Sequence, residues 1–267
     1  MSDPNSGSGW GVSHTPYGDV RNYNPNEFGG NGGSGGGNGG SNGGNESGTG
    51  AYSGRFDVGS LSSDAPSLDT SELTAIFNNT LRWEGLSHNM YADTLGNVTV
   101  GIGSLLSTPE AATRLGFQNR RVTRAHGDEL VGYVNASDAD IRSAYQGVKN
   151  IFNNKTLSQR QKTVQWSGSA MVLNDAEIGA LAVKHINSDR AGLRGLYAGF
   201  DGFPENAKVA LHDMAYNMGI TRLRDRFPRF NDAVNRRDWA AAAAESHRTT
   251  VGDDRNNATR DQLLNAR

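Results

Sequence analysis

A run made almost wholly of glycine, asparagine and serine divides this chain into two unequal parts. After Phe28, the run to Gly50 offers no apolar side chain to bury, and Glu46 is its only charged residue. Such a run cannot offset the entropy lost on ordering, so we expect a flexible tether. We therefore expect residues 1–68 to be a disordered tail and linker. The folded domain must then be built from residues 69–267.

The charge changes sign at nearly the same place. Residues 1–72 hold eight acidic and two basic side chains, whereas the whole chain of 267 residues holds 28 and 26. The remainder is mildly basic, which suits binding to an anionic polymer such as a bacterial cell wall. Nucleic acid would also fit by sign. The sequence has no basic stripe interleaved with aromatic residues, however, so we expect no nucleic-acid partner.

The sequence contains no cysteine and six scattered histidines. Disulfides and thiolate metal sites are excluded, and the histidines lack ligand spacing, so we expect no metal and no cofactor. No apolar run approaches the length of a membrane span, and the N-terminus lacks the basic-then-apolar pattern of a signal peptide. We expect a monomer with no membrane span, released by cell lysis or by a dedicated secretion machine.

Apolar spacing predicts that the folded part is mostly helical. Asp69 and Glu72 form a capping-box-like start, and the apolar stripe that follows reaches Glu84, where Gly85 is suited to end the helix. The same reasoning predicts further helices over residues 142–152, 174–186, 204–218 and 228–246, the last broken near 237–238.

Only residues 92–103 have the pattern of β-structure, and residues 107–170 are expected to be an extra, mostly helical segment. The predicted fold class is therefore α+β, mostly helical with one small β-hairpin lobe.

The residues around this hairpin carry groups that can hydrolyse a glycoside. That reaction needs one carboxylic acid to protonate the leaving oxygen and one carboxylate to direct a water. Glu84 continues the apolar face of its helix, where burial would keep it protonated, whereas Asp93 lies among polar turn residues and should stay ionised. Thr99 could help Asp93 to hold the water, and the backbone at Gly101 and Gly103 would allow close approach of a sugar.

These residues also form a pattern that resembles a known family. A Glu-Gly helix end is followed by Tyr91-Ala92-Asp93 with Gly96, and then by Thr99-Val100-Gly101-Ile102-Gly103. The sequence resembles the phage lysozymes of glycoside hydrolase family 24, and the likeness covers roughly 70–103 and 173–265. Ser104 stands where that family usually has His, a change expected to alter stability more than mechanism.

The resemblance implies a lysozyme-like fold and a set of site residues. Glu84 would be the general acid, Asp93 and Thr99 would position the water, and the β-1,4 bond between N-acetylmuramic acid and N-acetylglucosamine would be cleaved with inversion. Arg255 would be a charge partner of Glu84. The sugar cleft would be lined by Gly103, Leu105, Tyr216 and Asn217.

The tail contains a second, shorter likeness. Its spaced aromatic residues are either stray or part of a linear peptide that docks into a partner. The segment Ser6-Gly7-Ser8-Gly9-Trp10, with Pro16-Tyr17-Gly18 after it, resembles the box with which colicin-type bacteriocins bind TolB. That resemblance implies a toxin that acts in the periplasm of a target bacterium, with TolB or another translocation protein, an outer-membrane receptor and an immunity protein as partners.

Three hypotheses follow from the sequence. The first is a lysozyme-type bacteriocin that carries an import tail. The second is the same muramidase delivered as a secretion-system effector or a phage lysin. The third is a catalytically silent lysozyme fold that only binds the cell wall or a partner. The presence of Glu84, Asp93 and Thr99 together argues against the third, because a binding module has no need of all three.

Overall fold

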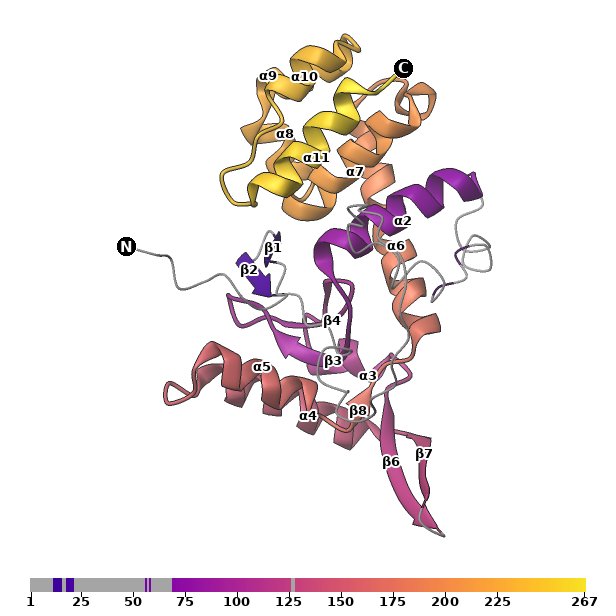
Figure 1. The fold of residues 1–267 in the computed structure, drawn as a ribbon, viewed down its shortest axis with the longest axis vertical. Helices are drawn as coiled ribbons and strands as arrows, with labels where there is room; N and C mark the ends of the chain where they lie inside the picture. Colours follow the sequence, from indigo (N-terminus) through magenta and orange to yellow (C-terminus); the bar gives the residue numbers. More distant parts are fainter. Residues whose placement is uncertain (1–11, 16–17, 22–55, 57, 59–68, 126–127) are drawn as a thin grey trace, which may run out of the picture.

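The computed structural model describes residues 12–15, 18–21, 56, 58, 69–125 and 128–267, which form a mixed α+β fold (Figure 1). The helices are α2 (Thr70–Glu84), α3 (Pro109–Thr113), α4 (Asp138–Asn153), α5 (Gln159–Ser167), α6 (Asp175–Leu196), the 3-10 turn η3 (Phe200–Gly202), α7 (Glu205–Met218), α8 (Ile220–Arg226), α9 (Pro228–Asn235), α10 (Trp239–Ala244) and α11 (Asp253–Leu264). The strands are β1 (Val12–Thr15), β2 (Gly18–Arg21), β3 (Ser87–Ala92), β4 (Val98–Gly101), β5 (Ser104–Leu105), β6 (Gln118–Ala125), β7 (Asp128–Asn135) and β8 (Met171–Val172).

Helix α2 forms where the apolar stripe predicts it. The carboxylate of Asp69 accepts a hydrogen bond from the Ser71 N–H at 3.0 Å, which satisfies one free donor of the first turn. Gly85 follows the helix with a φ of 71°, a left-handed value that favours glycine. Four stripe residues are buried in the core: Leu73, Ile76, Phe77 and Leu81.

Glu72 does not complete the expected capping box. Its side chain is buried and forms ion pairs with Lys208 at 2.7 Å and Arg190 at 3.3 Å. These partners come from α7 and α6, so the carboxylate ties three helices together instead of capping its own. A buried carboxylate needs such partners, because charge is costly to remove from water.

The helix is followed by the small predicted sheet. Its antiparallel strands have the order β3-β4-β5, with Ala92 opposite Val98 and Thr99 opposite Leu105. Val98 and Val100 are fully buried, so the sheet packs one side of the core. The β-hairpin lobe expected around residues 92–103 is therefore confirmed.

The segment 118–135 contradicts the expectation of a mostly helical insertion. Strands β6 and β7 pair along eight residues, from Gln118 opposite Asn135 to Ala125 opposite Asp128. This two-stranded ribbon extends from the body at the bottom of Figure 1, and the short strand β8 pairs with its base alone. The expectation that only residues 92–103 are β-structure was wrong, although α4 covers the predicted helix at 142–152.

Helix α6 connects two separate apolar cores. Ile178 and Ile186 belong to a core made with α2, α4 and the small sheet, whereas Leu193 belongs to a core made with α7 to α11. The prediction stopped at residue 186, because polar residues, Arg190 among them, interrupt the apolar stripe beyond it. In the structure the helix continues to Leu196, and Arg190 is buried against Glu72.

The second core surrounds α7, whose residues from Ala207 to Met218 are all buried. As predicted, the helix follows Pro204 and ends before Gly219, which has a φ of 80°. The predicted break near residue 237 is also confirmed. Helix α9 ends at Asn235, α10 starts at Trp239, and Arg237 between them has a left-handed φ of 56°.

Two stretches of the predicted tail and linker are described. Strands β1 and β2 form a short antiparallel pair, with Thr15 opposite Gly18, and β1 lies near α2 and α7. Phe56 packs against Phe77 with ring centroids 5.2 Å apart, and Val58 is buried in the first core. Apolar packing therefore extends into the segment expected to be linker, whereas the tether at 29–50 lies outside the described residues.

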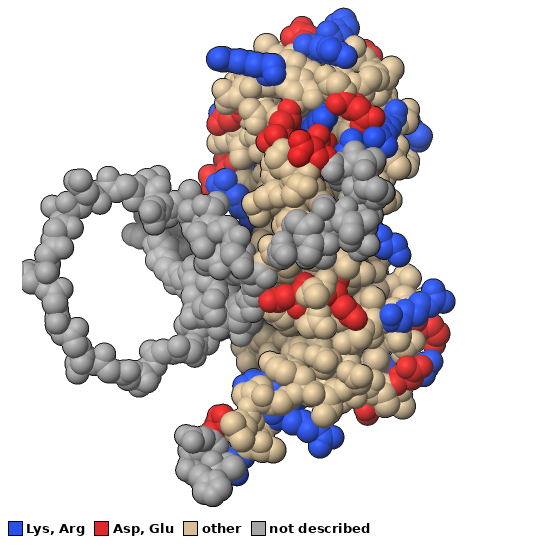
Figure 2. Space-filling view, turned by 90° about the vertical axis from the view of Figure 1, so that its right-hand side faces the viewer, with Lys and Arg blue, Asp and Glu red and all other residues tan. Residues whose placement is uncertain are grey.

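Within the described ranges no helix has both the length and the apolar character needed to cross a membrane. On the face seen in Figure 2, basic and acidic side chains are interspersed over both ends of the molecule.

Candidate active site

Glu84 is the last residue of α2, and its side chain is buried. Its Oε1 accepts a hydrogen bond from Nη2 of Arg255 in α11 at 2.8 Å. Burial raises the pKa of the Glu84 carboxyl, and the Arg255 guanidinium opposes this rise only in part. The carboxyl thus keeps its proton to a higher pH than an exposed glutamate. A general acid needs this property.

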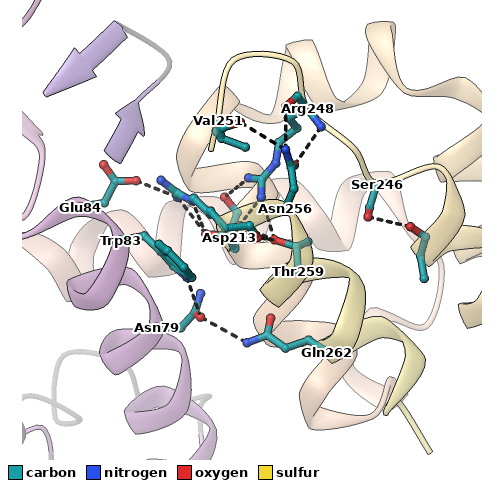
Figure 3. A network of polar contacts seen from close by, with 12 residues as sticks. Asn79, Trp83, Glu84, Asp213, Ser246, Arg248, Val251, Asn256, Thr259 and Gln262 are labelled. Carbon is teal, nitrogen blue, oxygen red and sulfur yellow. Dashed lines mark hydrogen bonds and ion pairs between the residues drawn. The ribbon is translucent and has the colours of Figure 1, made fainter. Parts of the chain in front are cut away.

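Arg255 is in turn held by a second buried carboxylate. Its Nε donates to Oδ1 of Asp213 at 2.9 Å, while Nη2 of Arg248 donates to Oδ2 at 2.7 Å and the Thr259 hydroxyl to the same oxygen at 2.9 Å (Figure 3). Burial would raise the pKa of Asp213, but the two guanidinium groups lower it to about 2. Asp213 is therefore ionised and fixes Arg255 beside Glu84.

Asp93 occupies the turn between β3 and β4. Its Oδ1 accepts hydrogen bonds from the backbone N–H groups of Leu95 at 2.9 Å and Asn97 at 2.8 Å. Its Oδ2 accepts one from Nδ2 of Asn97, also at 2.9 Å. The carboxylate is buried and fixed in orientation by this turn. Oδ2 has a second lone pair, which can accept a hydrogen bond from water.

Thr99 and Tyr91 lie opposite each other on β4 and β3. Thr99 is buried, and its hydroxyl donates to the carbonyl of Asn97 at 3.4 Å, a long hydrogen bond that is easily exchanged for a ligand. Burial raises the pKa of the Tyr91 hydroxyl, and the negative charges of Glu84 and Asp93 raise it further. Both candidate catalytic carboxylates therefore act electrostatically on the Tyr91 hydroxyl.

The predicted sugar-cleft residues are only partly brought together. A Cβ atom added at Gly103 would lie 3.6 Å from Oε2 of Glu84 and 3.7 Å from the Tyr216 ring, so these three residues are neighbours. Tyr216 donates its hydroxyl hydrogen to the Ile102 carbonyl. Leu105 is 44 % exposed at the edge of the small sheet, and Asn217 is buried in α7. The tail residues Ser6, Gly7, Ser8, Gly9 and Trp10 lie outside the described residues.

Sequence reasoning missed three residues of this site: Tyr91, Asp213 and Arg248. Asp213 had a detectable signal, because it lies three residues after Ala210 and three before Tyr216, on an inward face of α7. Arg248 had none, since its contact with Asp213 spans 35 positions of the chain. Ser104 is half-buried on β5, opposite Val100.

The described part of the chain contains no group of three or more His, Cys, Asp or Glu residues that could hold a metal ion. His212 is 1 % exposed, and burial with nearby positive charge lowers its pKa to about 3, so it is neutral. His185 stacks on Tyr216 with ring centroids 4.0 Å apart. Neither ring nitrogen of His212 has a hydrogen-bond partner among the described residues.

The sequence matches no protein-family model, and no curated protein matches it. The chemistry of the site is therefore interpreted from its own geometry.

Proposed function

We propose that this protein is a muramidase with a lysozyme-like fold. It would hydrolyse the β-1,4 bond between N-acetylmuramic acid and N-acetylglucosamine in peptidoglycan. The observation that carries the proposal is the pairing of two unlike carboxyls around Tyr91. Glu84 is buried with a raised pKa, while Asp93 is held by N–H donors in a turn. Such a pair supplies the acid and the base of glycoside hydrolysis.

In this mechanism each group has a defined task. Glu84 donates its proton to the glycosidic oxygen as the bond from the anomeric carbon to that oxygen breaks. Asp93 takes a proton from a water held with the Thr99 hydroxyl, and that water attacks the anomeric carbon from the other face. The product then has the inverted configuration. Gly103, which has no side chain beside Oε2 of Glu84, leaves room for the sugar ring.

The delivery of this activity is a second part of the proposal. The Gly-rich tether and the box Ser6 to Trp10 support a bacteriocin that enters the periplasm of a competitor with the help of TolB or another translocation protein. An outer-membrane receptor and a cognate immunity protein would complete its partners. The alternatives are a secretion-system effector or a phage lysin with the same enzymatic activity.

The catalytic proposal is tested by the loss of turbidity of purified peptidoglycan sacculi. Wild-type protein should clear the sacculi, and Glu84→Gln should be slower by about a thousandfold, because it cannot donate the proton. The matched control is Glu245→Gln, which changes an exposed glutamate just after α10 and should retain full activity. If wild-type protein and Glu84→Gln both bind sacculi but leave them intact, the protein is a binding module instead.

The delivery proposal needs a separate assay on intact cells. Killing of intact target cells should require residues 1–50, while clearing of sacculi should not. Killing that is unchanged by deletion of residues 1–50 would favour the effector or phage-lysin alternatives.

A further inference from the structure

A groove lies beside the last turn of α2, away from the proposed catalytic groups. Its volume is about 560 Å³, and it is lined by residues of α2, the start of α7 and α11, including Arg82, Trp83 and Asn206. Glu84, Asp93 and Thr99 do not line it. The groove is therefore a site of its own, although Trp83 is next to Glu84 in the chain.

Amide side chains dominate the lining of this groove, and each is oriented by one internal hydrogen bond. Nδ2 of Asn206 donates to the carbonyl of Asn265 at 3.1 Å, and Nε2 of Gln262 donates to Oδ1 of Asn79 at 3.2 Å. Within the described part of the chain, the side-chain oxygens of Asn206 and Gln262 accept no hydrogen bond. These acceptors are thus fixed in place and free for a ligand.

Asn257 supplies the complementary donor. Its Oδ1 accepts a hydrogen bond from Arg260 at 2.9 Å, so its Nδ2 is left to donate. The carboxylates of Asp254 and Asp261 also line the groove, although Oδ1 of Asp261 already accepts hydrogen bonds from Arg260 at 2.8 Å and 3.0 Å. Donors and acceptors therefore lie side by side on the surface of α11.

Trp83 gives the groove one flat apolar surface. The indole is half-buried, and its Nε1 donates to Oδ1 of Asn79 at 3.3 Å, the same oxygen that Gln262 uses (Figure 3). The guanidinium of Arg82 lies 4.7 Å from the ring centroid. The guanidinium thus covers one face of the ring, which leaves only the opposite electron-rich face for the slightly positive C–H groups of a sugar.

We propose that this groove binds a saccharide, an N-acetylated segment of a glycan strand distant from the bond being cut. Neighbouring sugar hydroxyls each donate and accept, which matches amides and carboxylates placed together. Asp261 is paired with Arg260, and Arg82 balances Asp254, so the lining has no net charge with which to attract a charged polymer. A second contact of this kind would raise the effective concentration of the protein on an insoluble glycan.

The test is an NMR titration of ¹⁵N-labelled Glu84→Gln protein with N-acetylchitotriose, so that binding is read without cleavage. The Trp83 indole N–H and the Asn257 side-chain amide should shift and saturate. The double variant Asn257→Ala/Gln262→Ala should weaken binding by about tenfold, or roughly 1.4 kcal/mol. Asn150→Ala, an exposed amide on α4, is the matched control and should bind normally.

Three results would overturn the proposal. One is the absence of any shift at ligand concentrations on the order of ten millimolar. Another is a set of shifts confined to Gly103 and Tyr216. The third is saturation of the groove by a lysine- and arginine-containing peptide but not by the saccharide. The choice of a glycan strand as ligand rests on the proposed function, but binding in the groove is read by NMR without cleavage, and the sacculus assay tests the catalytic role of Glu84 separately.

Discussion

Arg255 lies between Glu84 and Asp213 and donates a hydrogen bond to each, at 2.8 Å and 2.9 Å. The guanidinium belongs to α11, whereas the two carboxylates come from α2 and α7. Arg255 interacts more strongly with Asp213 than with Glu84, because Asp213 is ionised and is held in place by a second arginine, Arg248. Arg255 therefore orients Glu84 while only partly opposing the rise in pKa that burial causes.

Replacement of Asp213 by Asn should move the activity profile along the pH axis. The negative charge of Asp213 helps to raise the pKa of Glu84, and its loss leaves Arg255 to act on Glu84 alone. We expect the alkaline limb of the pH–rate profile of sacculus hydrolysis to shift to lower pH. The control is Asp225→Asn, which removes an exposed carboxylate that pairs with Arg224 and should leave the pH–rate profile unchanged.

The same Asp213→Asn variant should be less stable. It leaves Arg248 and Arg255 buried with too little negative charge, a defect that costs about 3–5 kcal/mol in comparable buried pairs. Urea unfolding at neutral pH measures the loss. A change below about 0.5 kcal/mol would show that the cluster relaxes or takes up water.

Glu84→Gln should unfold at a higher temperature than wild type at neutral pH. The pKa of Glu84 is raised in the folded protein, so its stabilising effect is complete below the pKa of the unfolded chain and is lost as pH rises through the folded pKa. Wild type and variant should therefore have similar Tm values in acid and diverge as pH rises. Parallel melting curves from pH 4 to pH 8 are the measurement, where constant separation contradicts the argument.

Gly103→Ala should reduce both stability and substrate binding. The φ of 72° at this position costs an alanine roughly 1–2 kcal/mol, and the new methyl group would stand beside Oε2 of Glu84. We expect a higher KM for sacculi with a smaller change in kcat. Gly147→Ala is the matched control, since it adds a methyl group on α4 with no atom within 4 Å and should stabilise the helix by about 0.5–1 kcal/mol.

Removal of the ribbon formed by β6 and β7 should leave the rest of the domain folded. Several of its large apolar side chains are exposed, among them Leu130 at 58 % and Tyr133 at 54 %. Joining Arg120 to Tyr133 through an Asn-Gly turn should therefore change Tm by only a few degrees and leave sacculus hydrolysis intact. Circular dichroism and the turbidity assay check this together, and loss of folding would mean that the ribbon stabilises the first core.

The sequence predicted those elements whose signals are local. Asp69, Gly85 and Gly219 mark helix ends through their own backbone preferences, and the structure has helix ends at each of them. The ribbon was missed because both of its faces are exposed. Its strands therefore show no apolar alternation, and Arg120-Arg121 interrupts the first of them.

The candidate site divides in the same way. Asp93, Leu95 and Asn97 form a turn whose bonds span four residues at most, so its geometry follows from the local sequence. The bond from Arg255 to Glu84 spans 171 positions, and its formation depends on how α2 packs against the second core. Such contacts have no local signature, which is why the role of Arg248 became visible only in the folded protein.

The cluster of Glu84, Asp213, Arg248 and Arg255 has a charge balance that depends on one proton. With Glu84 protonated, the cluster contains a single negative charge against its two guanidinium groups, and the buried region is positive. Once the proton has passed to the leaving oxygen, the charges cancel. The two guanidinium groups thus offset part of the cost of burying the Glu84 carboxylate that proton donation leaves behind, and Glu84 must take up a proton from solvent before each new cycle.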